Sequence, residues 1–238
     1  MKPVLLFIFL FAINFHPQRI YKGCFAISNG AEPKNYGRSG NLEIDRITTQ
    51  EIFFIQQRFL VAPIFFFYDD ANGKNAFATE KVYQQNGPDG TVFLGRRLFN
   101  SEFIRSPGGT SIPIIIAHEY AHIVDFKYGV LNEPGIRREL FADYLAGAYM
   151  SLRNRFFKQT NIYACVQSFE DMGGTDFSNP DFHGTSEQRG NALLAGYNEM
   201  EAHVSTGTPF LLTDINKAAK AYILKIKIPK DFSAKDPE

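Results

Sequence analysis

The chain has 238 residues, of which 45% are hydrophobic and 21% are charged, so it can bury a sizeable core and is not a disordered polyelectrolyte. Its 25 Lys and Arg balance 25 Asp and Glu, and no block of like charge stands out, which argues against a nucleic-acid partner. The two cysteines, Cys24 and Cys165, are too few for a disulfide framework or a four-thiolate site. A metal site in this chain must therefore use histidine and carboxylate ligands.

Residues 1–26 have the pattern of a secretory signal peptide, because Lys2 precedes ten apolar residues from Val4 to Ile13. This run is shorter than the ~20 residues that a spanning helix needs. The pattern predicts cleavage after Ala26 and a secreted or cell-envelope (periplasmic) location. Three alternatives stay open: membrane association through an anchor at residues 4–15, lipidation of Cys24, and a buried N-terminal strand.

Short strands are predicted in the first half of the remaining chain. Residues 27–44 contain glycine and proline and predict a linker, and apolar residues at helical spacing predict a helix over residues 45–59 with Asp45 as its cap. Strands are then expected over residues 64–68, after Pro63, and over 76–82 and 91–99. These segments imply a small sheet.

Helices are predicted in the second half. Residues 112–128 carry apolar side chains at helical spacing, with Ser111 as a candidate cap, Pro113 in the first turn and Gly129 as terminator. Further helices are expected over residues 134–157, 160–171, 185–204 and 213–225, before a loose polar tail at 229–238. The pattern predicts one α+β domain over residues 45–228, mostly helical with a small mixed sheet. Its core is expected to hold Tyr120, Tyr144, Tyr149 and an inert Cys165.

The helix predicted over residues 112–128 contains the H-E-x-x-H arrangement His118-Glu119-Tyr120-Ala121-His122. Residues four apart on a helix lie about 40° apart around its axis, so both imidazoles can bind one metal ion. Glu119 points in a neighbouring direction and can act as general base on a metal-activated water. The alternative is a surface helix with an incidental pair of histidines, but the apolar residues on both sides of the motif favour a buried helix.

The next predicted helix carries two carboxylates four residues apart, Glu139 and Asp143, in an otherwise apolar segment. Buried charges need partners. A metal ion would partner Glu139, and the N–H group of His118 would partner Asp143, which would then orient that imidazole. The alternative for Glu139 is a contact with a nearby arginine on a solvated face.

Two histidines and one glutamate make the three-ligand set that catalytic zinc takes, with one position left for water. The predicted site is therefore one Zn²⁺ per chain on His118, His122 and Glu139. Glu133 is a rival third ligand, but it precedes Pro134 in a loop and has no carboxylate four residues further on.

His118-Glu119-x-x-His122 followed by Glu139-x-x-Ala142-Asp143 resembles the gluzincin metallopeptidases, particularly the group of CAAX prenyl proteases and soluble periplasmic quality-control proteases. Two further segments are similar. Asn75-Ala76-Phe77-Ala78 resembles a segment that those enzymes place before the active-site helix, and residues 181–189 resemble their C-terminal His-Pro-x-x-x-x-Arg element and a similar element of bacterial neutral zinc metallopeptidases. The resemblance covers about residues 45–204 and implies a zincin-like fold with the sheet beside the active-site helix.

The resemblance also implies roles for two residues of the C-terminal element. His183 would stabilise the developing oxyanion, and Arg189 would hold the segment in place. The alternatives are a histidine that bonds its own backbone at a helix N-terminus and an arginine in a structural ion pair.

The expected function is that of a zinc metalloendopeptidase, which hydrolyses polypeptide substrates with a zinc-activated water and Glu119 as general base. An inactive zincin-like domain that binds peptide or a partner protein is the main alternative. A metal-dependent hydrolase acting on a non-peptide amide is a third possibility.

Overall fold

The structure is a computed structural model that describes residues 34, 36–71, 73–83, 87–131, 135–158, 160–174, 182–209 and 211–228. The predicted signal segment, Cys24, Glu133 and the tail from residue 229 lie outside these ranges. Within them, no helix is both long and apolar enough to cross a bilayer.

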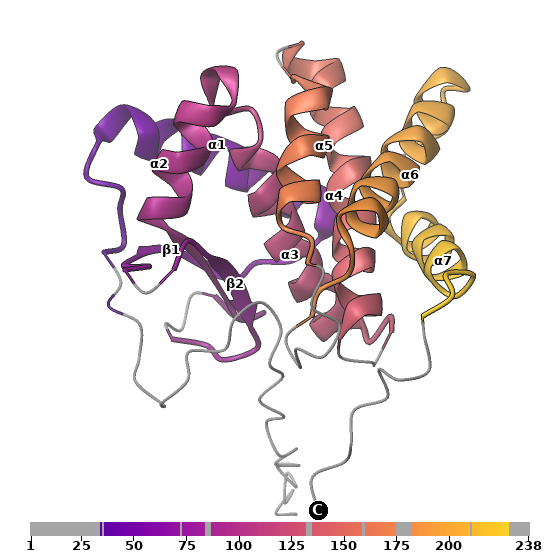
Figure 1. Cartoon of the computed structure of the whole chain (residues 1–238), viewed down its shortest axis with the longest axis horizontal. Coiled ribbons are helices and arrows are strands. Elements are labelled where there is room, and N and C mark those ends of the chain that lie inside the picture. The colour runs from indigo at the N-terminus through magenta and orange to yellow at the C-terminus, as the bar shows by residue number, and fades with distance from the viewer. Residues whose placement is uncertain are drawn as a thin grey trace, which may run out of the picture.

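The described chain is mostly helical with a small mixed sheet, which confirms the predicted α+β class (Figure 1). The elements in order are α1 (Leu42–Phe59), β1 (Ile64–Tyr68), β2 (Ala76–Thr79), β3 (Thr91–Gly95), α2 (Arg96–Arg105), a 3-10 turn (Pro107–Gly109), α3 (Ile112–Tyr128), α4 (Ile136–Phe157), α5 (Ile162–Asp171), α6 (Ser186–Ser205) and α7 (Leu212–Ile223). Helix α3 lies between the half that holds the sheet, α1 and α2 and the half that holds α4 to α7 (Figure 1).

The sheet has the order β1-β3-β2. β1 pairs in parallel with β3, with Phe66 opposite Phe93, and β2 pairs antiparallel to β3, with Phe77 opposite Phe93. Alternate side chains face opposite sides, so Val92 and Leu94 join the main core while Phe93 stacks in a separate aromatic cluster. β2 is thus an edge strand of the described sheet, and it lies against α3.

Two predicted boundaries of the N-terminal half are wrong. The first helix begins at Leu42, because the side chain of Asn41, and not that of Asp45, accepts hydrogen bonds from the backbone N–H groups of Glu43 and Ile44. The second strand ends at Thr79 rather than at residue 82.

The strand predicted over residues 91–99 is also wrong in its second half, where helix α2 begins at Arg96. The carboxylate of Asp70 accepts hydrogen bonds from the backbone N–H groups of Arg97 (2.7 Å) and Leu98 (2.9 Å). These N–H groups have no partner within the helix, so a side chain distant in the sequence caps it. Ser111, by contrast, does not cap α3, and its hydroxyl donates to Glu102 instead.

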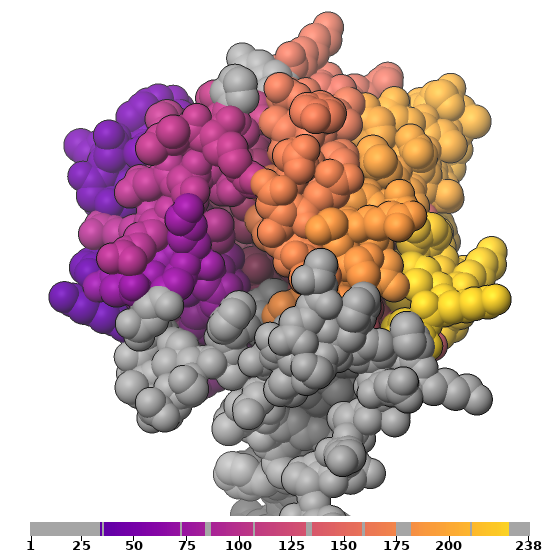
Figure 2. Space-filling view, viewed as in Figure 1, coloured from indigo at the N-terminus to yellow at the C-terminus, as the bar shows by residue number. Residues whose placement is uncertain are grey.

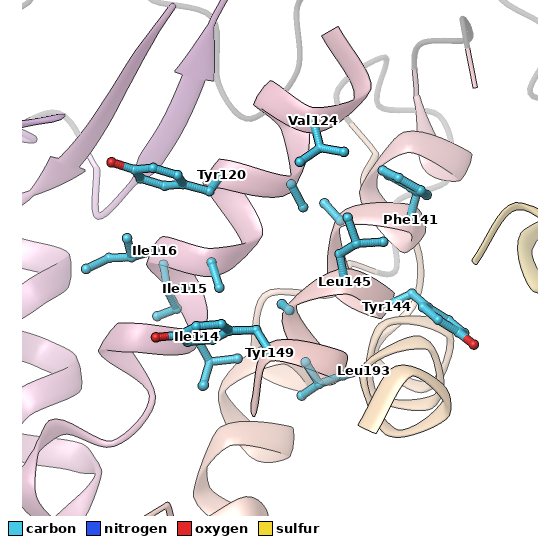
Figure 3. Close-up of a cluster of buried hydrophobic side chains, with 14 of the residues drawn as sticks. Ile114, Ile115, Ile116, Tyr120, Val124, Phe141, Tyr144, Leu145, Tyr149 and Leu193 are labelled. Atoms are coloured by element: carbon cyan, nitrogen blue, oxygen red, sulfur yellow. The ribbon is translucent and has the colours of Figure 1, made fainter. Parts of the chain in front are cut away.

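The main core lies between α3 and α4 (Figure 3). The labelled side chains Ile114, Ile116, Tyr120 and Val124 come from α3; Val124 lies on the side of Phe141 and Leu145 of α4, whereas Ile116 and Tyr120 point to the other side of α3. Tyr120, Tyr144 and Tyr149 are at most 3% exposed, as predicted. Cys165 is fully buried, and burial raises the pKa of its thiol to about 12, which agrees with an inert core residue.

Helices α4 and α6 pack closely because each has a glycine against the backbone of the other. A Cβ atom at Gly147 would lie 1.8 Å from the carbonyl oxygen of Leu193, and one at Gly196 would lie 1.8 Å from that of Tyr144. No side chain fits there, since the obstructing atoms belong to the backbone. This close approach brings the first turn of α6 to the charged residues of α4.

We therefore expect Gly196→Ala to lower the free energy of unfolding by about 1–3 kcal/mol, because the added methyl group forces the two helices apart. Urea denaturation followed by circular dichroism measures this change. Asn198→Ala is the matched control, since Asn198 is exposed on the same helix. Equal stability of Gly196→Ala and wild type would contradict the close packing described here.

Candidate metal centre

Helix α3 places His118 and His122 one above the other on its buried face. Every residue from Ile114 to Asp125 is buried, so the surface-helix alternative is wrong. Pro113 stands in the first turn of the helix, and Gly129 ends it in the left-handed conformation (φ 59°), as predicted.

Three side chains converge from α3 and α4 to form a group that could hold a metal ion: His118, His122 and Glu139. The Nε2 atoms of the two histidines lie 3.1 Å apart, and the carboxylate oxygens of Glu139 lie 3.4 Å from His118 Nε2 and 3.5 Å from His122 Nε2. Ligands bound at ~2.0–2.1 Å to a tetrahedral ion lie about 3.3 Å from one another. The three donors therefore have the separations that such an ion requires.

Asp143 and Arg189 orient one of the three donors, His118, through hydrogen bonds. The Nδ1 atom of His118 lies 2.8 Å from a carboxylate oxygen of Asp143, which leaves Nε2 directed at the other two donors. Arg189 donates two hydrogen bonds to the same carboxylate, at 2.9 and 2.7 Å, and both residues are at least 97% buried. The ion pair of Arg189 thus holds the carboxylate that orients His118.

Three carboxyl groups and one arginine are buried at this centre. Glu119, Glu139 and Asp143 are buried there with one arginine, Arg189. Burial opposes the ionisation of Glu139, but the nearby histidines hold the pKa of its carboxyl well below its usual value. Asp143 behaves similarly, because Arg189 and His118 outweigh the effect of burial and lower its pKa. Arg189 balances one of these two ionised carboxylates, and either a protonated His118 or a bound cation would balance the other.

The two histidines have opposite protonation properties without a metal. Burial favours the neutral form of His118, but its hydrogen bonds to Asp143 and Glu139 dominate and raise its pKa to about 9. Burial lowers the pKa of His122 to about 3, so this imidazole is a neutral base at pH 7. A metal ion binds only the neutral imidazole, so metal binding requires His118 to lose its second proton.

Glu119 lies beside the three donors but faces a cavity. Burial is the main cause that raises the pKa of its carboxyl to about 8. Its Oε2 atom is buried and accepts no hydrogen bond from any residue that the structure describes. A buried oxygen of this kind has a place for a water molecule or a ligand.

The cavity has a volume of about 440 Å³ and opens between the two halves of the molecule. Asn75 and Ala76 at the start of β2, with α2, form one side, α5 forms the other, and His118 and Glu119 lie on α3 between them. Figure 2 shows α2 and β2 in magenta and purple on one side of this face and α5 in orange on the other. The charged centre is therefore open to solvent through the cavity.

His183 also lines the cavity, and its Nδ1 atom lies 3.5 Å from a carboxylate oxygen of Glu139. Only the family resemblance predicts this position for His183, since no local pattern of the sequence does. Its imidazole comes from the segment before α6, whose first turn is fixed by a reciprocal capping box between Thr185 and Gln188.

The sequence patterns do not predict helix α2, which forms one wall of the cavity. Glu102 is 4% exposed and accepts hydrogen bonds from Ser111, Ser168 and Arg105, and Arg105 also pairs with Asp171 on α5. This network ties α2 to α5 across the cavity. The helical spacing of Leu98, Phe99 and Glu102, all buried, is the signal that could have revealed the helix.

No protein-family model, no curated protein and no solved structure matches this chain.

The metal-free protein should show an unusually basic His118. We expect its imidazole to titrate near pH 9 in ¹⁵N-edited NMR spectra, and we expect Asp143→Asn to lower this pKa because a neutral amide stabilises the imidazolium less than a carboxylate does. His118→Gln identifies the resonance. A His118 pKa at or below the ordinary value of about 6.5 would contradict the charge arrangement described here.

Proposed function

We propose that this protein is a zinc-dependent metalloendopeptidase of the gluzincin type. The observation that carries the proposal is the placement of Glu119: a buried carboxylate with an oxygen free of described partners lies beside a two-histidine, one-glutamate centre and lines the same cavity. A centre that only stabilises a fold has no use for such a group. The resemblance of the H-E-x-x-H and E-x-x-A-D motifs to gluzincins supports the same conclusion.

Zinc fits the donors because imidazole nitrogen and carboxylate oxygen are its common ligands, and His118, His122 and Glu139 would hold it. When bound, zinc polarises the scissile carbonyl and makes water a stronger acid. The orientation of His118 by Asp143 keeps its Nε2 lone pair on the metal side.

Glu119 moves the proton in this proposal. Its carboxylate accepts a proton from the attacking water and passes it to the nitrogen of the leaving amine. A nearby cation would favour the ionised form, and so oppose the effect of burial on its pKa. Glu119 is thus expected to be a competent base only when the centre is loaded.

His183 and the edge of the sheet would act on the substrate. The imidazole of His183 faces the cavity near Glu139 and would donate to the oxyanion that forms at the carbonyl. Asn75 and Ala76 bring the start of edge strand β2 to the same cavity. An extended polypeptide could pair with this edge through main-chain hydrogen bonds. The predicted signal segment supports a secreted or envelope location for this activity.

The first test is the metal content. Wild type should bind one zinc per chain, and His122→Ala should lose it because two protein ligands cannot hold the ion tightly. Elemental analysis after gel filtration measures the ratio. His203→Ala is the control, since His203 is on α6 and pairs with Glu199. Stoichiometric zinc in His122→Ala would remove this ligand from the proposal.

The second test separates a catalyst from a binding domain. Glu119→Gln should keep zinc and fold while it slows cleavage of an unfolded protein such as casein by about 10²–10⁴-fold, because the amide cannot accept the proton. His183→Ala should cause a smaller fall, by about 10²–10³-fold at most, with zinc retained.

Both rates are measured with and without a zinc chelator. If wild type holds zinc and binds peptide but cleaves nothing, the protein is a binding domain. If Glu119→Gln cleaves as fast as wild type, Glu119 is not the base.

A further inference from the structure

A buried ion pair joins the end of α3 to the start of α4. The Nε atom of Arg138 donates to a carboxylate oxygen of Asp125 at 2.7 Å, and the two side chains are 5% and 1% exposed. The other carboxylate oxygen of Asp125 accepts a hydrogen bond from the backbone N–H group of Leu131 at 2.8 Å. The carboxylate therefore holds both the chain that leaves α3 and the helix that follows.

The same pair lies close to the candidate metal centre along both helices. Arg138 directly precedes Glu139 on α4, and Asp125 lies three residues after His122 on α3. The guanidinium of Arg138 also lies over the ring of Phe126, 5.4 Å from its centroid. Phe126 in turn lies roughly parallel to the imidazole of His122, with centroids 6.4 Å apart. A continuous set of contacts thus runs from the ion pair to a histidine of the centre.

The centre depends on the separation of the two helices. The histidines come from α3 and the glutamate comes from α4, so a shift between the helices changes the 3.5 Å separation of His122 and Glu139 directly. A shift of 1 Å would move the carboxylate outside the range in which three donors share one ion. Asp125 and Arg138 form a polar link between the helices close to this point, and both are too deeply buried to exchange their partner for water.

We infer that Asp125 and Arg138 are positioning residues that set the distance between the histidine and glutamate ligands. This inference rests on the proposed zinc site. The pair does not touch the ion, and its effect passes through Glu139 and through the Phe126–His122 contact. Loss of the pair should therefore weaken zinc binding in a protein that is still folded.

Helix α4 offers a matched control in a second buried ion pair. The Nε atom of Arg153 donates to Glu51 of α1 at 2.8 Å, and these side chains are 11% and 7% exposed. Glu51 keeps a second partner, the hydroxyl of Tyr149, as Asp125 keeps Leu131. Arg153→Met and Arg138→Met therefore remove the same kind of interaction from the same helix, but only Arg138 is next to a ligand.

The experiment measures the zinc dissociation constant of full-length protein by competition with a chelator, at a temperature where circular dichroism shows each variant folded. Arg138→Met should weaken zinc binding by about 10–100-fold, the range typical of residues that orient ligands. Arg153→Met should change it by less than about 3-fold. The absorption bands of the cobalt-substituted protein should change in Arg138→Met and not in Arg153→Met, because they report ligand geometry.

Asp125→Asn serves if Arg138→Met does not fold, since asparagine keeps one of the two acceptor oxygens, the one that can still receive the backbone N–H group of Leu131, and loses the ion pair with Arg138. It should also weaken zinc binding. The double variant should bind zinc no more weakly than the single variant with the larger effect, because the pair acts as a unit.

If the wild type binds zinc tightly and Arg138→Met and Arg153→Met weaken that binding equally, the positioning role is wrong and the proposed function stays intact. Failure of the wild type to bind zinc would overturn both.

Discussion

Helix α4 buries two carboxylates, and the helices around it must supply their partners. Glu139 and Asp143 are 2% and 0% exposed on a helix that is buried over most of its length. Two carboxylates in such a place would unfold the helix unless other elements supplied partners. α3 supplies two histidines, α6 supplies Arg189, and the segment before α6 supplies His183.

Small residues make this neutralisation possible. The reach of an arginine side chain is limited, and Arg189 meets Asp143 only because α4 and α6 cross with glycine against backbone. The capping box at Thr185 fixes where α6 begins and thus where Arg189 stands in its first turn. Packing and electrostatics are coupled here, since a larger residue at the crossing would move the guanidinium away from the carboxylate.

The candidate site was more predictable than the fold around it, for a physical reason. His118, His122, Glu139 and Asp143 lie within two helices, and the period of a helix determines which side chains share a face. Helix α2 was not predicted because its N-terminus is capped by Asp70, and because Val92, Phe93 and Leu94 before it favour a strand. The ion pair of Asp125 with Arg138 depends likewise on how two helices pack, and no local pattern reveals such a contact.

Glu119 is the residue on which the proposed catalytic function, as opposed to a structural metal site, depends. Three protein donors leave one position of a tetrahedral ion open, and a structural site would close it with a fourth ligand. The nearby carboxylate of Glu119 lines the cavity, where burial raises its pKa and Oε2 has no partner among the described residues. This arrangement costs stability, since an apolar side chain of the same size would avoid the desolvation of a carboxylate. A costly group that adds nothing to packing is expected where a reaction needs a base, so its position beside an open cavity agrees with the proposed function.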